Sequence, residues 1–273
     1  MTNKQRIILT RLVVGYMLFF LLLRFFEHGT SSGLMKPPLF IVQMDITYWA
    51  YRLSPIPGLI IYNKIGSIVF DCLLFGSGIL SFLFPLKTRL IIPFSLFVFI
   101  YILTLNGFGM HHAHWMTGMM IVLFPFWVKD NNKFYLLWQG VRYYTCFVYA
   151  MAFIWKTAIG DSFFNWQQGL GSFKLNLVAY MYHNPDTLLS SFYRWCIREG
   201  WFLNAGNLII MLLEASMILG FFTKKWDGLL FWIPVIIHVA TYFFSDVLFL
   251  ELLVLDFSLL GVKQLDRFQT FIK

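Results

Sequence analysis

Three side chains spaced seven residues apart could form one chemically active row. They are Arg142, Tyr149 and Lys156, and they fall in the apolar stretch of residues 135–156. Seven residues are about two turns of an α-helix and drift by only about 20° per step, so all three share one face. A buried lysine can act as a general base, because desolvation disfavours its charged form. The alternative is that Lys156 extends its stem toward lipid headgroups.

Arg142 requires a partner more strictly than Lys156 does. It lies about two turns inside the stretch, and a guanidinium in the apolar layer of a membrane needs a carboxylate beside it. Glu214 and Asp71, which lie within two other apolar stretches, are the candidate partners. Each ionisable group in such a stretch needs a partner or a purpose. We expect some of them to converge on a pocket that opens to the non-cytoplasmic side; the others are His114, His238, Glu251 and Asp256.

A histidine cluster precedes another apolar stretch and includes His111, His112 and His114. Three interpretations are open: a metal site, interfacial hydrogen bonding, and a catalytic or substrate-orienting role. Residues i and i+3 of a helix can share a ligand face, but no cysteine or carboxylate lies nearby in the sequence and the spacing is not that of a known zinc site. We therefore expect no metal, and His112 and His114 are the catalytic candidates. His238 is either a site residue or a hydrogen-bonded packing residue.

The composition places the chain in a membrane. Of its 273 residues, 59% are hydrophobic, 20% aromatic and only 12% charged. Soluble domains contain roughly 25% charged residues, so this chain lacks the polar side chains that cover a water-facing surface. Its net charge of +8 is spread between apolar stretches. That distribution predicts membrane lipids as partners and argues against nucleic acid.

The apolar stretches predict an all-α integral membrane protein with about eight transmembrane helices in a single membrane domain, residues 1–273. Two non-cytoplasmic excursions, residues 27–57 and 157–205, interrupt the spans, and the second is expected to form short interfacial helices. The predicted spans are about 7–26, 58–84, 89–105, 115–128, 135–156, 206–222, 228–244 and 247–262.

The charges between these spans predict the orientation. Eight spans place both termini on one side, where the loops and tails contain eleven Lys and Arg residues against three acidic ones, Asp130, Asp227 and Asp266. The opposite loops contain five basic and six acidic residues. Basic residues remain on the cytoplasmic side of the spans that they flank. We therefore expect a multi-pass protein of a bacterial inner membrane with both termini in the cytoplasm.

Several familiar membrane chemistries are disfavoured by the motifs. The three cysteines, Cys72, Cys146 and Cys196, form no C-x-x-C pair, which argues against thiol redox chemistry. The sequence contains no nucleophile elbow, no phosphate-binding loop and no H-E-x-x-H motif. A small transporter is also disfavoured, because no repeated half is visible.

The strongest resemblance to a known family lies in the stretch that contains the seven-residue row. Arg142, Tyr149, Ala152 and Lys156 match the order and spacing of the vitamin K-dependent gamma-glutamyl carboxylase family and the related bacterial HTTM domains. Further similar segments cover most of the chain: Arg11 to Gly15 with Glu27, Leu103 to Gly118, Trp166 to Gly169, Glu214, Lys224-Lys225, and His238 with Phe244-Ser245.

The resemblance implies a quinol-linked carboxylase. In that family the residue matching Lys156 is the proposed base that deprotonates the quinol, and the anion reacts with oxygen to form a strong base that drives carboxylation of glutamate. It implies reduced vitamin K or another hydroquinone as cofactor, an isoprenoid quinone as partner, and a peptide or protein substrate on the non-cytoplasmic side. A histidine of the 111–114 cluster or His238 would hydrogen-bond the other quinol oxygen.

Two departures from the family pattern qualify that expectation. The chain ends about ten residues after its last predicted span, whereas the animal enzymes continue into a large lumenal domain. Trp155 stands where the family often has a second basic residue before the lysine. The alternative function is a non-catalytic membrane module that binds a quinone or a lipid, or that scaffolds a partner protein. In that case Lys156 pairs with a phosphate or a carboxylate and stays charged.

Overall fold

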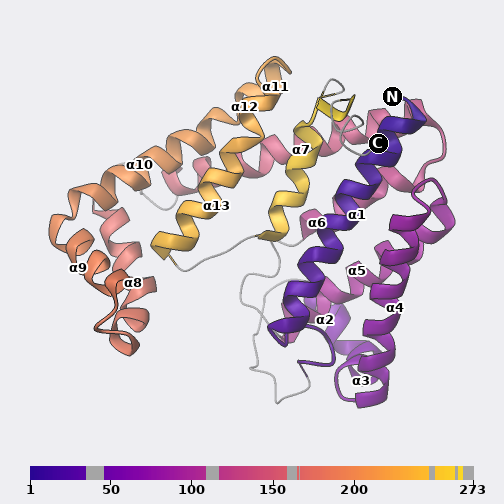
Figure 1. Cartoon of the computed structure of the whole chain (residues 1–273), viewed down its shortest axis with the longest axis horizontal. Helices are drawn as coiled ribbons and strands as arrows, with labels where there is room; N and C mark the ends of the chain where they lie inside the picture. Colours follow the sequence, from indigo (N-terminus) through magenta and orange to yellow (C-terminus); the bar gives the residue numbers. More distant parts are fainter. Residues whose placement is uncertain are drawn as a thin grey trace. The chain divides into compact units, whose positions relative to one another are not determined.

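The computed structural model describes residues 1–34, 46–108, 117–158, 165, 167–245, 250–261 and 264–266 (Figure 1). All regular secondary structure within these ranges is helical, which confirms the predicted all-α class. The chain divides into two compact units, one of Met1–Val141 with Gly261–Lys273 and one of Arg142–Leu260. The single membrane domain stays a prediction, and each unit is described by itself below.

The first unit is built on three long apolar helices, α1 (Asn3–Phe26), α4 (Lys64–Leu83) and α5 (Thr88–Phe108). Thr2 and Gln5 form a capping box that begins α1, and the Asn63 side chain caps α4. The two later helices form an antiparallel hairpin, and the Ser81 hydroxyl donates to the Leu90 carbonyl across it. Gly78 permits the close packing, because a Cβ there would lie 2.9 Å from the Phe94 ring.

Shorter helices and polar contacts complete this unit. They are α2 (Ile46–Leu53), α3 (Ile56–Ile60), α6 (Thr117–Leu123) and the 3-10 helix η2 (Phe124–Trp127). The Arg6 guanidinium donates to the carbonyls of Val128 and Lys129 and lies over the Phe134 ring. These contacts attach the first turn of α1 to the segment that precedes α7 (Asn131–Ala158), a helix of 28 residues that continues into the second unit.

The second unit packs the later part of α7 with several shorter helices. They are α10 (Trp201–Ser216), α11 (Leu219–Phe222), α12 (Asp227–Leu230), α13 (Trp232–Ser245) and the 3-10 helix η3 (Leu250–Leu259). Its core contains Cys146, Met217, Leu230, Ile237 and Leu259, all buried. A separate pair of helices, α8 (Gln168–His183) and α9 (Leu188–Glu199), encloses a second cluster around Phe173, Tyr193 and Cys196.

Among the described residues, five helical segments are long and apolar enough to span a membrane by length and composition: Asn3–Phe26, Lys64–Leu83, Thr88–Leu105, Trp201–Phe222 and Asp227–Phe244. They coincide with five of the eight predicted spans. The remaining three, 115–128, 135–156 and 247–262, stay predictions: their described parts are α6 with η2, both short, the long α7, which contains a polar row, and η3, which has ten residues.

Candidate functional site

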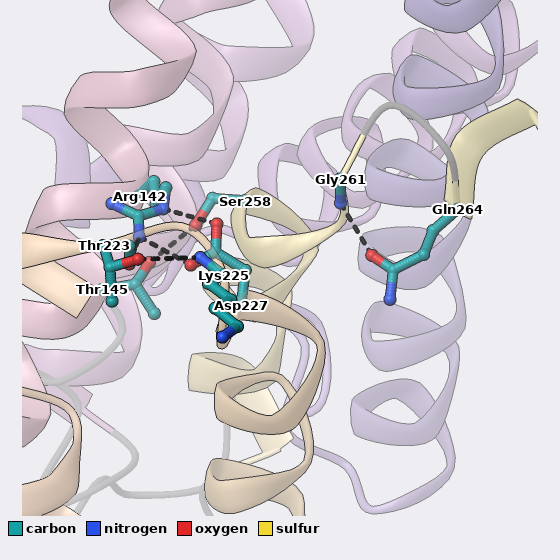
Figure 2. A network of polar contacts seen from close by, with 8 residues as sticks. All are labelled: Arg142, Thr145, Thr223, Lys225, Asp227, Ser258, Gly261 and Gln264. Carbon is teal, nitrogen blue, oxygen red and sulfur yellow. Dashed lines mark hydrogen bonds and ion pairs between the residues drawn. The ribbon is translucent and has the colours of Figure 1, made fainter. Parts of the chain in front are cut away.

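Arg142, the first residue of the predicted row, forms a buried ion pair. Arg142 donates from Nε and Nη2 to the two carboxylate oxygens of Asp227, at 2.8 and 2.6 Å, and Nη2 also donates to the Thr223 carbonyl at 2.9 Å (Figure 2). The Arg142 side chain is fully buried. Two parallel hydrogen bonds to one carboxylate are the strong geometry for a guanidinium. The pair joins α7 to the first residue of α12.

This contact corrects the predicted partner of Arg142, which was Glu214 or Asp71. Glu214 binds another cation, and Asp71 accepts hydrogen bonds from the backbone of Ser31 and Ser32 in the first unit. The sequence interpretation placed Asp227 in a cytoplasmic loop together with Lys224 and Lys225. In the structure the chain turns back at that loop, so Asp227 faces α7.

Tyr149, the second residue of the row, contacts another aromatic side chain inside the second unit. The Tyr149 hydroxyl and His238 Nε2 lie 3.0 Å apart, and the proton position on the ring decides which of them donates. Their rings meet edge to face with centroids 6.0 Å apart, and both side chains are buried. This contact places His238 of α13 in the row rather than in apolar packing alone.

Lys156, the third residue of the row, forms an ion pair with Glu214. The Lys156 ammonium donates to Glu214 Oε1 at 2.5 Å. The lysine side chain is 37% exposed, whereas that of Glu214 is 4% exposed. Glu214 Oε2 is buried and accepts no hydrogen bond from the described residues. Lys156 thus reaches from the end of α7 to a carboxylate held inside the unit by α10.

The three side-chain contacts of the row follow from helix geometry together with packing. Residues spaced by seven lie on one side of α7, and that side meets partners from α10, α12 and α13. Apolar contacts separate these three polar contacts from one another. Cys146, one turn after Arg142, packs so tightly against α11 that a Cβ on Gly220 would lie 2.3 Å from its sulfur.

A further polar contact beside the row was not expected from the sequence. The Thr145 hydroxyl lies 3.0 Å from the Ser258 hydroxyl (Figure 2). It donates to the Leu255 carbonyl at 3.2 Å. Threonine and serine occur so often in helices that their positions carry no signal of this contact. Asp256, on the same 3-10 helix, is fully buried, and neither carboxylate oxygen has a hydrogen-bond partner among the described residues.

Other predicted site residues lie apart from the row or outside the described ranges. Trp155 is 60% exposed on the outer surface of α7. His111, His112 and His114 lie outside the described residues, as does Trp166. Within the described part of the chain, no group of three or more His, Cys, Asp or Glu residues could hold a metal ion.

What the row can do chemically follows from its three kinds of contact. The arginine pair is closed and structural, the tyrosine and histidine can pass a proton between them, and the lysine pair combines an accessible amine with a buried carboxylate. Comparisons of this chain with protein-family models, with curated proteins and with solved structures found no match.

Proposed function

We propose that the chain is a multi-pass membrane enzyme of the quinol-dependent carboxylase type, in which Lys156 is the general base. The observation that carries this proposal is the Lys156–Glu214 pair, an accessible amine backed by a buried carboxylate. The resemblance of Arg142, Tyr149, Ala152 and Lys156 to the carboxylase family supports it. The proposal includes a bacterial inner membrane, cytoplasmic termini, a site open to the non-cytoplasmic side and a peptide or protein substrate there.

The residues around the pair fit a hydroquinone. Only one N–H of the Lys156 ammonium is used by Glu214, and the side chain remains accessible. The buried Oε2 of Glu214 retains the capacity to accept a hydrogen bond. Tyr149, seven residues before Lys156 on α7, and its partner His238 of α13 are suited to the other oxygen of the ring. A bound hydroquinone would supply an acidic hydroxyl and the reducing equivalents for reaction with oxygen.

Glu214 has a defined part in the proton chemistry. Transfer of one proton from Lys156 Nζ to Glu214 Oε1 converts the ion pair into a neutral amine and a neutral acid, and it removes the charge from the buried carboxylate. The neutral amine can then accept a proton from a substrate hydroxyl. The resulting ammonium remains beside the oxygen that lost its proton and stabilises the negative charge there. Tyr149 holds the His238 ring in one orientation.

The direct test is substitution of the base. In full-length protein reconstituted in lipid nanodiscs, Lys156→Ala and Lys156→Arg should reduce hydroquinone-dependent turnover by about 100-fold or more, the usual contribution of a positioned base. Lys174→Ala on α8 removes an exposed lysine and should leave turnover unchanged. Undiminished turnover in both Lys156 variants would contradict the proposal.

The ion pair also favours a second function, a non-catalytic module that binds a quinone or a lipid or scaffolds a partner. If Lys156 stays charged beside Glu214, the ion pair stabilises the fold or a bound headgroup and does not imply catalysis. The two functions separate in one measurement with a short-chain naphthohydroquinone as the probe. Saturable binding that Lys156→Ala leaves intact, without turnover in the unsubstituted protein, supports the module and contradicts the enzyme.

A further inference from the structure

The α8–α9 hairpin presents a continuous apolar stripe on the outside of each helix. On α8, Leu175, Val178 and Tyr182 are 79%, 60% and 80% exposed. Their spacing of three and four residues places them on one face of the helix. On α9, Leu188, Phe192 and Trp195 repeat the pattern and are also exposed. The inner faces of the two helices pack on each other around Phe173 and Tyr193, so these outer stripes are additional to the core.

The side chains of α9 divide into three sectors. Tyr193 and Cys196 face the hairpin core, and Arg194 and Arg198 lie one turn apart beside the stripe. The Leu188–Phe192–Trp195 stripe is exposed, and the inner edges of its two aromatic rings contact Phe244 of α13 and Phe202 of α10. Among the described residues, neither arginine pairs with a residue of another helix: Arg194 donates to Ser191, and Arg198 forms an ion pair with Glu199 on the same helix. A helix with Trp, Phe and Leu on one face and arginines beside it is typical of segments that lie in a membrane interface.

The hairpin lies at one end of two candidate spans. The Tyr193 hydroxyl donates to the carbonyl of Phe243, near the end of α13, at 2.8 Å, and the Asn204 side chain near the start of α10 accepts from the Leu170 backbone at 2.9 Å. Only Gly200 separates α9 from α10, and its φ of +22° makes the corner. A helix joined by one residue to a spanning helix must lie within reach of the bilayer surface.

We propose that the α8–α9 hairpin is an amphipathic element embedded in the interfacial layer of an anionic bilayer. Its two apolar stripes lie among the first methylenes of the acyl chains, and Arg194 and Arg198 bind lipid phosphates. The Phe202 ring contacts both Trp195 of α9 and Trp201 at the start of α10, and the exposure of these two tryptophans argues for one lipid-facing surface. Tryptophan and arginine are the residues that anchor segments at this depth. The proposal does not depend on the enzymatic function.

The depth of each stripe can be measured by spin labels on single cysteines in the full-length Cys72→Ala protein, because Cys146 and Cys196 are buried. Labels at Val178 and Trp195 in nanodiscs should collide with oxygen and be shielded from a water-soluble nickel chelate. A label at Ser191, on the arginine side of α9, should collide with the chelate. Access of the chelate to all three labels would overturn the proposal in favour of a water-exposed hairpin. Shielding of the Val178 and Trp195 labels from both reagents would overturn it in favour of a protein partner or a second copy.

The lipid headgroup is tested separately by thermal unfolding in nanodiscs of phosphatidylglycerol and of phosphatidylcholine. Phosphatidylglycerol should raise the midpoint, and Arg194→Gln with Arg198→Gln should remove at least half of that rise. The matched control, Lys129→Gln with Lys133→Gln, changes the net charge equally outside the hairpin and should retain the rise. Equal losses in both variants, or no rise in the unsubstituted protein, would show that the arginines have no specific role in headgroup binding.

Discussion

At the scale of single residues, two of the buried carboxylates in the second unit lie in contrasting surroundings. Asp227 accepts two hydrogen bonds from Arg142, whereas Asp256 accepts none from the described residues. Removing one partner of a buried pair leaves the other charge uncompensated, and that loss exceeds the net value of the pair. A carboxyl without a partner contributes no such compensation. The two positions should therefore respond oppositely to the same change.

Asp227→Asn should destabilise the protein by about 3 kcal/mol or more, because the Arg142 guanidinium would remain buried without a counterion. Asp256→Asn should leave stability unchanged or raise it, because it replaces a carboxyl that has no hydrogen-bond partner among the described residues. Thermal unfolding of both variants in the same detergent is the measurement. A destabilised Asp256→Asn variant beside an unaffected Asp227→Asn variant would contradict the described pairing.

Asp130 offers a pH-dependent contrast outside the spans. Its carboxylate accepts the backbone N–H groups of Lys133 and Asn132 at the start of α7, and the hydrogen bond from Lys133 is the largest cause that lowers the Asp130 pKa. A lowered folded-state pKa stabilises the folded chain above the unfolded pKa of about 4, and this stabilisation is lost as the pH falls through the folded value.

Asp130→Ala should therefore be less stable than the unsubstituted protein at pH 7, and the difference should shrink as the pH is lowered below about 4. Asp130→Asn retains a capping oxygen without a titratable group and is the control, since its stability should not show this acid dependence. Unfolding midpoints from pH 7 to pH 3 provide the comparison. A difference between the alanine variant and the unsubstituted protein that grows at acid pH would contradict the sign.

At the scale of elements, the distance between α7 and α11 depends on one glycine. A Cβ on Gly220 would lie 2.3 Å from Cys146 Sγ, closer than packed atoms approach, and 3.2 Å from Leu230. Gly206, within α10, has open space around its Cβ position. The two glycines therefore have different roles: the first permits helix packing, and the second only lowers helix propensity.

Gly220→Ala should destabilise the protein by about 1–3 kcal/mol through overpacking. Gly206→Ala should be neutral or stabilising by up to about 1 kcal/mol, because alanine favours the helix. Cys146→Ala added to Gly220→Ala should recover part of the loss, since it removes the sulfur from the contact. A double-mutant cycle by thermal unfolding measures this coupling, and strictly additive effects would exclude a direct contact between the two positions.

At the scale of the whole molecule, the number of membrane-spanning helices decides whether the two termini lie on the same side of the membrane. The part of the chain that the structure describes contains five helical segments that qualify as spans by length and composition, and the apolar stretches of the sequence predict eight. An even number places the termini on the same side, whereas an odd number separates them. The loops therefore discriminate between these topologies.

In the Cys72→Ala background, Asn184→Cys between α8 and α9 should react with a membrane-impermeant maleimide in intact cells. Asn132→Cys at the start of α7 should react only after permeabilisation, because the eight-span topology places it in the cytoplasm. Mass-shift labelling on gels is the readout. Labelling of Asn132→Cys in intact cells would contradict the predicted orientation.

The sequence by itself determined the helical class, the five strongly apolar segments and the grouping of Arg142, Tyr149 and Lys156. These features depend on local composition and on the period of the helix, which are properties of contiguous residues. Only the tertiary structure decided the partners. Arg142 binds Asp227, Lys156 binds Glu214 and Tyr149 contacts His238, because residues from 58 to 89 positions away are brought to α7 by the packing of α10, α12 and α13. Several carboxylates satisfy the same electrostatic requirement, so the choice among them belongs to the packing.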